Sequence, residues 1–338
     1  MTLDLATARK FSVAPMMDWT DRHCRTLHRM LTAHALLFTE MVTSAAVVHG
    51  RREQLLGFDA FEQPVALQLG GSDPAELAEA TRVGTAFGYA EINLNVGCPS
   101  DRVQSGRFGA CLMAEPELVA NCVRAMRDAT DLPVTVKCRI GIDDQDTEES
   151  LDRFADLMVG AGVAALYVHA RKAWLKGLSP KENRTIPPLD YPRVYRLAER
   201  LDVPTFINGG IETLDAAHEH MRHVDGVMLG RAAYHDPVLL ARVDEEFFGA
   251  PARAFDLKAV LMAMADYAET QLAAGVRLNA VTRHMLGLAN GLRGARTFRQ
   301  ILSVDACKRG AGPEVIMAAW NAVDPAQSVS SSELALTA

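Results

Sequence analysis

Short apolar runs alternate along the chain with longer segments whose apolar residues recur every three or four positions. The short runs are often β-branched, which is typical of buried parallel strands. The eight runs cover residues 11–15, 36–42, 64–69, 91–96, 133–138, 165–169, 204–208 and 226–230. The longer segments have helical spacing. Helix starts are expected at residues 72–74 and 115–116, and at the N-caps Thr147 and Thr213.

Eight strands separated by helices favour an α/β fold, a closed (β/α)8 TIM barrel, over an open doubly wound sheet. An open sheet usually has a glycine-rich turn after its first strand. Here the first strand is followed by Pro15, Met16, Met17 and Asp18. Residues 171–191 contain three prolines and form a long connection, so we expect an ordered insertion among the loops.

The pattern changes beyond Pro251, where helical spacing continues to about residue 307 without any strand-like alternation. Leu257, Val260, Leu261 and Met264 form one apolar stripe of this segment. We therefore expect a barrel domain over residues 1–250 and an all-helical C-terminal domain over residues 251–325. Residues 326–338 are expected to form a flexible tail.

The composition limits the class of protein. Six cysteines are scattered without a C-x-x-C pair, which argues against a zinc site and indicates reduced thiols. There is no run of about 18 apolar residues, so no membrane span is expected. The first ten residues lack the apolar core of a signal peptide. These features predict a cytoplasmic protein without a metal, and the sequence gives no evidence of an obligate protein partner.

The net charge of −7 is distributed unevenly along the chain. Residues 251–310 contain nine Lys or Arg and four acidic residues, so this segment carries +5 and the remainder −12. A basic segment on an acidic body is suited to local binding of a polyanion. The alternative is an arginine-rich helix face that contacts only solvent.

Active sites of TIM barrels lie at the carboxyl ends of the strands, and phosphate groups commonly bind the loops after strands seven and eight. These loops contain Asn208, Gly209 and Gly210, and then Gly230 and Arg231. Glycine allows a phosphate to approach backbone N–H groups, and arginine adds a forked cationic donor. The alternative is that the glycines serve turn geometry alone.

A flavin mononucleotide (FMN) would use such a phosphate site and would also need hydrogen bonds to its ring. Gln68, Lys137 and His169 end strands three, five and six, where their side chains are expected at the barrel mouth. Lys137 is the expected cation near the part of the flavin that becomes anionic on reduction. His169 has an alternative as a core histidine bonded to a carbonyl.

The fourth strand is followed by Gly97, Cys98 and Pro99, a turn that would present the thiol outward. An ordinary thiol holds its proton at neutral pH and can donate it. The alternative, a buried structural cysteine, suits Cys122 and Cys138 better because both lie inside expected regular elements.

Several of these segments together resemble one family, the tRNA-dihydrouridine synthases. The matching segments are residues 12–22 (Ser-Val-Ala-Pro-Met-Met-Asp-Trp-Thr-Asp-Arg), 93–103 (Asn-Leu-Asn-Val-Gly-Cys-Pro-Ser-Asp-Arg-Val), 106–112, 169–172, 207–210 and 230–231. Residues 139–144 and 178–184 resemble the subgroup called synthase A. The resemblance extends over residues 11–310, and the ordered set of motifs makes it specific.

The resemblance implies an enzyme that reduces uridines 20 and 20a in the tRNA D-loop to dihydrouridine, with FMN as cofactor and NADPH as reductant. The target base would be flipped out of the RNA. Hydride would pass from the flavin to C6, and Cys98 would protonate C5. The implied FMN site consists of Pro15, Met16, Met17, Gln68, Lys137, His169, Asn208, Gly209, Gly210, Gly230 and Arg231.

The resemblance also implies that the basic segment binds tRNA. Asn95 would contact the substrate base, and the expected RNA contacts are Arg171, Asn183, Arg184, Arg296 and Arg299. Two alternatives remain at this stage. One is an FMN barrel enzyme that acts on a small free pyrimidine or an enone, and the other is an RNA-binding barrel without catalytic activity.

Overall fold

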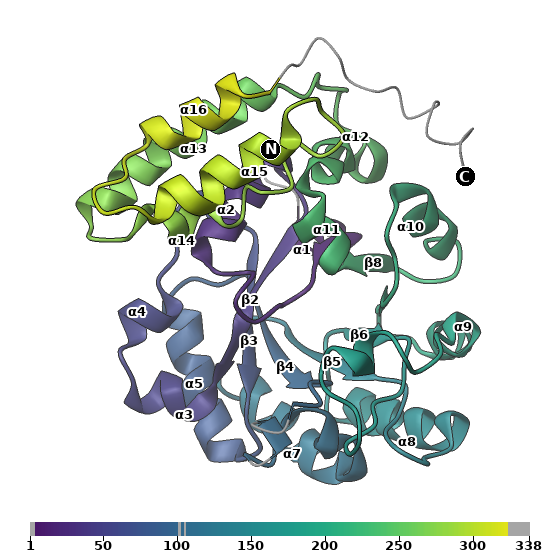
Figure 1. Cartoon of the computed structure of the whole chain (residues 1–338). Coiled ribbons are helices and arrows are strands. Elements are labelled where there is room, and N and C mark those ends of the chain that lie inside the picture. Colours follow the sequence, from purple (N-terminus) through teal and green to yellow (C-terminus); the bar gives the residue numbers. More distant parts are fainter. Residues whose placement is uncertain (1–3, 101–102, 105, 324–338) are drawn as a thin grey trace. The chain divides into compact units, whose positions relative to one another are not determined.

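A computed structural model describes residues 4–100, 103–104 and 106–323 of the chain. Its centre is a closed barrel of eight parallel strands in chain order (Figure 1). The strands are β1 (Phe11–Val13), β2 (Leu36–Thr43), β3 (Val65–Gly70), β4 (Glu91–Val96), β5 (Val134–Arg139), β6 (Leu166–His169), β7 (Thr205–Asn208) and β8 (Gly226–Leu229). All eight predicted strands are confirmed, with bounds that differ by at most two residues.

Pairing of the last strand with the first excludes the open-sheet alternative. Phe11 is registered with Val227 and Val13 with Leu229, so β8 closes onto β1. Because all strands run in the same direction, their carboxyl ends meet at one mouth of the barrel. Residues that end different strands are therefore neighbours in space.

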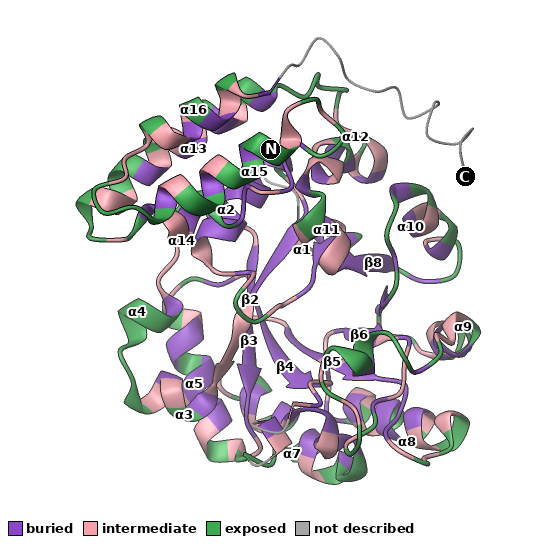
Figure 2. Ribbon diagram, in the orientation of Figure 1, coloured by how far each residue is buried: buried purple, intermediate pink, exposed green. Residues whose placement is uncertain are grey.

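Helices follow the strands on the outside of the barrel, with their buried residues on one side and exposed residues on the other (Figure 2). The helices of this unit are α1 (Leu5–Ala8), α3 (Ser44–His49), α4 (Arg52–Leu56), α5 (Pro74–Ala86), α7 (Pro116–Arg127), α8 (Thr147–Gly160), α9 (Tyr191–Arg200) and α10 (Leu214–His220). Short 3-10 turns cover Ala60–Glu62 (η1), Gly109–Ala114 (η2) and Glu182–Arg184 (η3). The predicted helix starts at residues 72–74 and 115–116 are confirmed.

Two N-cap predictions had different outcomes. Thr213 caps α10, because its side chain accepts a hydrogen bond from Ala216 N. Thr147 is not the cap of α8. That position belongs to Asp146, whose carboxylate accepts from the N–H groups of Glu148 and Glu149, and Thr147 is the first helical residue. A carboxylate at the N-terminus also has a favourable interaction with the helix dipole.

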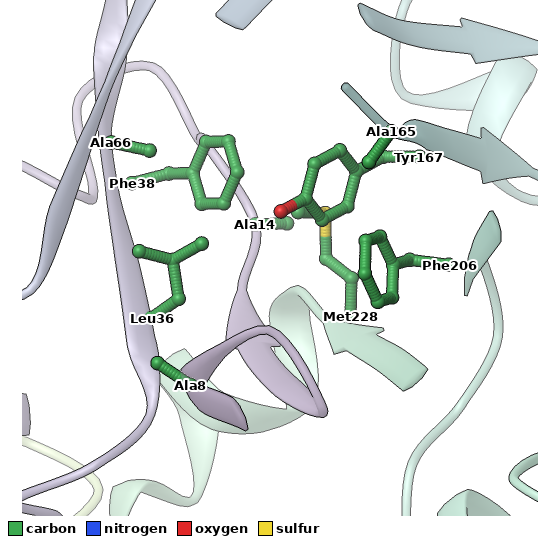
Figure 3. Packing of buried hydrophobic residues seen from close by; sticks show 9 residues of the cluster. All are labelled: Ala8, Ala14, Leu36, Phe38, Ala66, Ala165, Tyr167, Phe206 and Met228. Carbon is green, nitrogen blue, oxygen red and sulfur yellow. The ribbon is translucent and has the colours of Figure 1, made fainter. Parts of the chain in front are cut away.

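Aromatic and small side chains fill the interior of the barrel (Figure 3). Tyr167 stacks on Phe206 with ring centroids 4.8 Å apart and meets Phe38 edge-on at 5.2 Å. The cluster consists of Ala8, Ala14, Leu36, Phe38, Ala66, Ala165, Tyr167, Phe206 and Met228. Mixed large and small side chains allow the layers of a barrel to pack without voids, so the interior is a solid core.

The remaining helices form a second compact unit, whose described residues are 23–33 and 231–323. Its helices are α2 (Arg22–Leu31), α11 (Arg231–His235), α12 (Val243–Phe248), α13 (Leu257–Ala273), α14 (Leu278–Thr282), α15 (Ala295–Val304) and α16 (Glu314–Asn321). The 3-10 turns of this unit are η4 (Pro237–Arg242) and η5 (Asp305–Cys307). The predicted all-helical C-terminal region is thus present.

The boundary between the two units differs from the predicted one at residues 250 and 251. The barrel unit ends at Gly230, and α2 joins the helical unit although it lies near the N-terminus. Hydrogen bonds explain this assignment: His23 Nδ1 lies 2.8 Å from Tyr267 Oη, and the Thr32 hydroxyl donates to Asp244. The predicted flexible tail, residues 326–338, lies outside the described residues.

Candidate active site

Polar side chains from four strands meet at the mouth of the barrel. Asn95 on β4 is registered with Lys137 on β5, and His169 on β6 with Asn208 on β7. Lys137 Nζ donates to Asn208 Oδ1 at 3.0 Å and so bridges β5 and β7. The structure therefore brings together these predicted site residues, as the parallel topology requires.

Lys137 is a cation held in a desolvated position. The pKa of Lys137 is lowered to about 8, first by desolvation and then by the positive charge of Arg139. Of its three N–H groups, one has an acceptor among the residues that the structure describes, Asn208 Oδ1. The ammonium group therefore retains donor capacity for a carbonyl or anionic group bound at the mouth.

The Cys98 turn is held by hydrogen bonds on both sides of the cysteine. Asn95 Oδ1 accepts from the N–H groups of Gly97 at 3.1 Å and Cys98 at 3.0 Å. The carbonyl of Cys98 accepts from Ala110 N at 2.9 Å. Gly109 has a φ of +77°, and a Cβ at that position would lie 2.5 Å from the Cys98 carbonyl oxygen. Fixed backbone on both sides gives the thiol, which is partly exposed, a defined position.

Two buried cysteines in regular elements differ from Cys98. Cys122 in α7 and Cys138 in β5 are fully buried, and desolvation raises the pKa of each thiol to about 12. Buried thiols of this kind are inert. The prediction that Cys122 and Cys138 are structural agrees with this burial.

The glycines after β7 and β8 have different reasons to be glycine. Gly209 and Gly210 have φ angles of +113° and +69°, a region that favours glycine, so turn geometry explains both. Gly230 has no positive φ, and a Cβ there would meet no atom of the described chain closer than Met16 Sδ at 3.7 Å. Neither backbone conformation nor crowding requires glycine at position 230, which fits the approach of a bound group such as a phosphate.

Arg139, at the end of β5, ties the Cys98 turn to the long insertion between β6 and α9. Its Nε donates to the Gly97 carbonyl at 2.9 Å, and its Nη1 donates to the carbonyls of Lys172 and Asn183 at 3.0 Å. The pKa of Arg139 is lowered to about 10, mainly by desolvation, and the charges of Arg184 and Arg171 act in the same direction. Arg139 thus joins the cysteine turn to an insertion that carries two further arginines.

Asn183 has a different role from the predicted one. Its side chain is fully buried, accepts from Trp174 N at 2.7 Å and donates to Trp174 O at 2.9 Å. Because this amide is used to fix the insertion, the prediction that Asn183 contacts RNA directly is wrong. Arg184, the next residue, is exposed, and the partly exposed Arg171 donates to the Pro187 carbonyl.

Trp174 was missed by the sequence reasoning. Its side chain is 37% exposed, and Lys172 Nζ lies 5.9 Å from its ring centroid. Gln104 Nε2 donates both to the Pro99 carbonyl and to the carbonyl of Leu175, which links the cysteine turn to this part of the insertion. The sequence feature that could have identified it is a tryptophan that stands between two lysines in an expected loop.

The remaining residues predicted for the FMN site and the RNA contacts lie in both units. Pro15 and Met16 are partly exposed after β1, and Met17 is exposed. Gln68 is buried within β3 with its amide bonded to Asn93 and Asn95. In the helical unit, Arg231 begins α11, and Arg296 and Arg299 are exposed on α15. The geometry of the described chain assigns none of these residues a ligand, so their roles stay predictions.

The described part of the chain lacks two kinds of feature. It contains no group of three His, Cys, Asp or Glu side chains placed to hold a metal ion. None of its helices has both the length and the apolar character needed to cross a bilayer.

The family model and the similar proteins of known name indicate the same family. Residues 12–322 match the family model described as dihydrouridine synthase. The chain is 57% identical over 321 residues to the tRNA-dihydrouridine(20/20a) synthase of Xanthomonas campestris pv. campestris, covering 94% of this chain and 95% of that protein. It is 56% identical over 315 residues to the synthase of the same name from Escherichia coli (strain K12), covering 93% and 91%.

Solved structures support the fold at much lower identity. The complex of 2-naphthoyl-CoA reductase with 2-naphthoyl-CoA aligns with a TM-score of 0.53 at 11% identity, over 70% of this chain and 50% of that one. An old yellow enzyme homologue from Zymomonas mobilis aligns with a TM-score of 0.52 at 12% identity, over 74% and 92%. At such identities the likeness concerns the fold alone.

Proposed function

The chain belongs to the dihydrouridine synthase family, and from this premise we propose that it reduces uridines 20 and 20a of the tRNA D-loop to 5,6-dihydrouridine. FMN is the cofactor and NADPH the reductant of the proposed reaction. The observation that carries the proposal is the presence of Cys98 and the desolvated Lys137 at one barrel mouth. The reduced thiols fit a cytoplasmic location, where tRNA is processed.

The residues at the mouth suit a flavin. The loop at Gly230 leaves room beside its backbone for the phosphate, next to Met16. Lys137 offers free N–H donors and positive charge, and His169 and Asn208 lie on the adjacent strand ends. Bound FMN would take electrons from NADPH and supply hydride to C6 of the uracil ring. Arg231 follows Gly230 directly in the chain and is the proposed cationic partner of the phosphate.

Cys98 completes the reduction as a general acid. Its thiol gives a proton to C5 of the base, and the resulting thiolate takes a new proton from solvent. The bonds from Asn95 and Ala110 hold the cysteine backbone, so the thiol needs little reorganisation to reach a base at the mouth. Asn95 is also proposed to contact that base.

The insertion between β6 and α9 is the proposed RNA contact of the barrel unit. Arg171, Lys172 and Arg184 supply charge for phosphates, and the exposed Trp174 offers an indole face for an unpaired base. Asn183 contributes by fixing Trp174. In the helical unit, Arg296 and Arg299 are the proposed phosphate contacts.

The test is the reduction of purified unmodified tRNA compared with free uridine, each with NADPH. We expect a yellow protein with flavin absorbance at about 450 nm, turnover of tRNA, and dihydrouridine at positions 20 and 20a. Turnover of free uridine alone would identify a small-molecule reductase. A colourless protein that binds tRNA without reducing it would identify a non-catalytic barrel.

A further inference from the structure

The barrel interior contains a continuous series of polar side chains, of which the proposed site involves only Gln68 and Asn95. Glu91, Asn93 and Asn95 occupy alternate positions of β4, so they point to the same side of the strand. All three are buried. Gln68 on β3 and Thr135 on β5 are the registered neighbours of Asn93. Polar groups buried in this way require partners within the protein.

These side chains partner one another from one end of the barrel to the other. At the amino end of β4, Arg9 Nε donates to Glu91 Oε2 at 2.7 Å. The Thr135 hydroxyl donates to the other carboxylate oxygen of Glu91. Asn93 Nδ2 in turn donates to Thr135 Oγ1 at 2.9 Å.

The series continues towards the mouth through two amides. Gln68 Nε2 donates to Asn93 Oδ1 at 2.8 Å, and Asn95 Nδ2 donates to Gln68 Oε1 at 2.8 Å. Asn95 Oδ1 then accepts from the N–H groups of Gly97 and Cys98. A single path of hydrogen bonds therefore joins the Arg9–Glu91 ion pair to the cysteine turn.

The groups at the two ends of this path require the same direction of hydrogen-bond donation along it. The Glu91 carboxylate is only an acceptor, and the backbone N–H groups of the cysteine turn are only donors. Each amide between them has one oxygen and one nitrogen. Rotating any amide by 180° would place two acceptors or two donors opposite each other, at the cost of a buried unsatisfied group.

We propose that Glu91 is a positioning residue for Cys98. Its charge, neutralised by Arg9, orients Thr135 and the three amides so that Asn95 presents an oxygen to the cysteine turn. A buried ion pair is a poor source of stability compared with apolar packing, but it can select one arrangement of polar groups. The role in catalysis rests on the proposed function, whereas the orientation of the turn does not.

The test interrupts the path at Thr135, which is fully buried and lies between Glu91 and Asn93, away from the cysteine. Thr135→Val removes the hydroxyl at nearly constant volume, and Thr135→Ser keeps it. The first measurement is amide hydrogen exchange of the holoenzyme, followed by mass spectrometry. In the valine protein, we expect the amides of Gly97 and Cys98 to exchange about tenfold faster, the equivalent of one hydrogen bond.

The serine protein should exchange like the unchanged protein, and peptides from β7 should exchange equally in all three.

The second measurement is the oxidation of reduced enzyme by tRNA in a single turnover. We expect a slower rate with unchanged tRNA affinity for Thr135→Val and recovery for Thr135→Ser. If the valine protein fails to fold, Thr135→Ala replaces it, because alanine also lacks the hydroxyl and is smaller. Both measurements are then made on the alanine protein.

Equal exchange at Gly97 and Cys98 in the valine and serine proteins would overturn the inference. Faster exchange with an unchanged single-turnover rate would overturn the catalytic role of the orientation. Hydrogen exchange requires no tRNA. Failure of the unchanged protein to reduce tRNA would therefore count against the proposed function and leave the exchange result valid.

Discussion

At the scale of single residues, the ionisation of Lys137 is the property most closely tied to the proposed chemistry. Below a pH of about 8 the side chain is protonated, and above it the positive charge is lost. A cation at the mouth stabilises negative charge that accumulates on a reduced flavin. The same desolvation that lowers the pKa also strengthens this electrostatic effect.

We therefore expect the reduction potential of the bound flavin to fall more steeply with pH above about 8 than that of the Lys137→Met protein. The expected cause is deprotonation of Lys137, which removes the stabilising charge from the reduced state. Redox titrations between pH 6.5 and 9.5 measure this difference. Parallel pH profiles for the two proteins would exclude Lys137 from the stabilisation of the reduced flavin.

The sequence allowed the main residues of the site to be predicted, but not their hydrogen bonds. Strand ends converge in any parallel barrel, so Lys137, Asn208 and Cys98 could be placed at one mouth. The burial of Asn183 depends on how the insertion folds back on itself, which no local pattern encodes. By contrast, the alternating polar residues of β4 were visible in the sequence.

At the scale of elements, the insertion between β6 and α9 should contribute to RNA affinity. We expect Trp174→Ala to raise the KM for tRNA by roughly 5- to 150-fold with little change in kcat. The reason is that stacking of a base on an aromatic ring is worth about 1–3 kcal/mol. Trp174→Phe should retain part of the affinity. Steady-state kinetics with unmodified tRNA measure the effect.

Phe61 provides a matched control for this substitution. It is also an exposed aromatic residue, but it lies in η1, before β3 and therefore away from the carboxyl ends of the strands. Phe61→Ala should leave the KM for tRNA unchanged. Similar effects of the alanine substitutions at Trp174 and Phe61 would contradict a specific contact at the insertion.

Local elements were predictable to different degrees. The eight strands follow from their apolar runs, and the α10 cap follows from Thr213. The α8 cap was misassigned because Asp146 and Thr147 are adjacent and both can cap a helix. Membership of α2 in the helical unit depends on partners more than 200 positions away, such as Asp244 and Tyr267. Helical periodicity carries no information about such contacts.

His28, a buried histidine of α2, should make the stability of the protein depend on pH. The pKa of His28 is lowered from 6.5 to about 3, mainly by desolvation and then by the charges of His284 and Arg29. Between these values the unfolded chain binds a proton that the folded chain excludes, so this contribution to stability falls as the pH falls from 6.5 towards 3.

The expected loss from His28 approaches about 1.4 kcal/mol per pH unit well below pH 6.5. Urea unfolding followed by circular dichroism at pH 7.0, 6.0 and 5.0 measures it. His28→Gln, which keeps a donor but does not titrate, should reduce the decline over this range. An identical decline in both proteins would show that His28 is not its source.

At the scale of the whole molecule, the uneven distribution of charge supports the proposed binding of tRNA by an acidic protein. The net charge is −7, but the excess of basic residues in the segment 251–310 gives it a charge of +5. On α15, Arg296 and Arg299 are exposed, whereas Phe298 and Leu302 are buried. One face of this helix thus packs in the helical unit and another offers cations to solvent.

Replacing both arginines with serine should lower the slope of log affinity for tRNA against log salt by about 1 to 2, because fewer counterions are released on binding. Filter binding over a range of salt concentrations measures the slope. The control is Arg82→Ser with Arg222→Ser, which removes two exposed arginines paired with Glu79 and Glu219. An equal change in slope for both double variants would indicate a non-specific effect of net charge.

The central claim is that the Cys98 thiol protonates the base reduced at the barrel mouth. The most direct measurement is the rate at which unmodified tRNA oxidises the pre-reduced enzyme, compared between the unchanged protein and Cys98→Ala. The account predicts equal flavin content and equal reduction by NADPH in both proteins. It also predicts that oxidation by tRNA is slower by about 10²- to 10⁴-fold in the alanine protein, the usual contribution of a general acid. A nearly unchanged rate of oxidation by tRNA would contradict it.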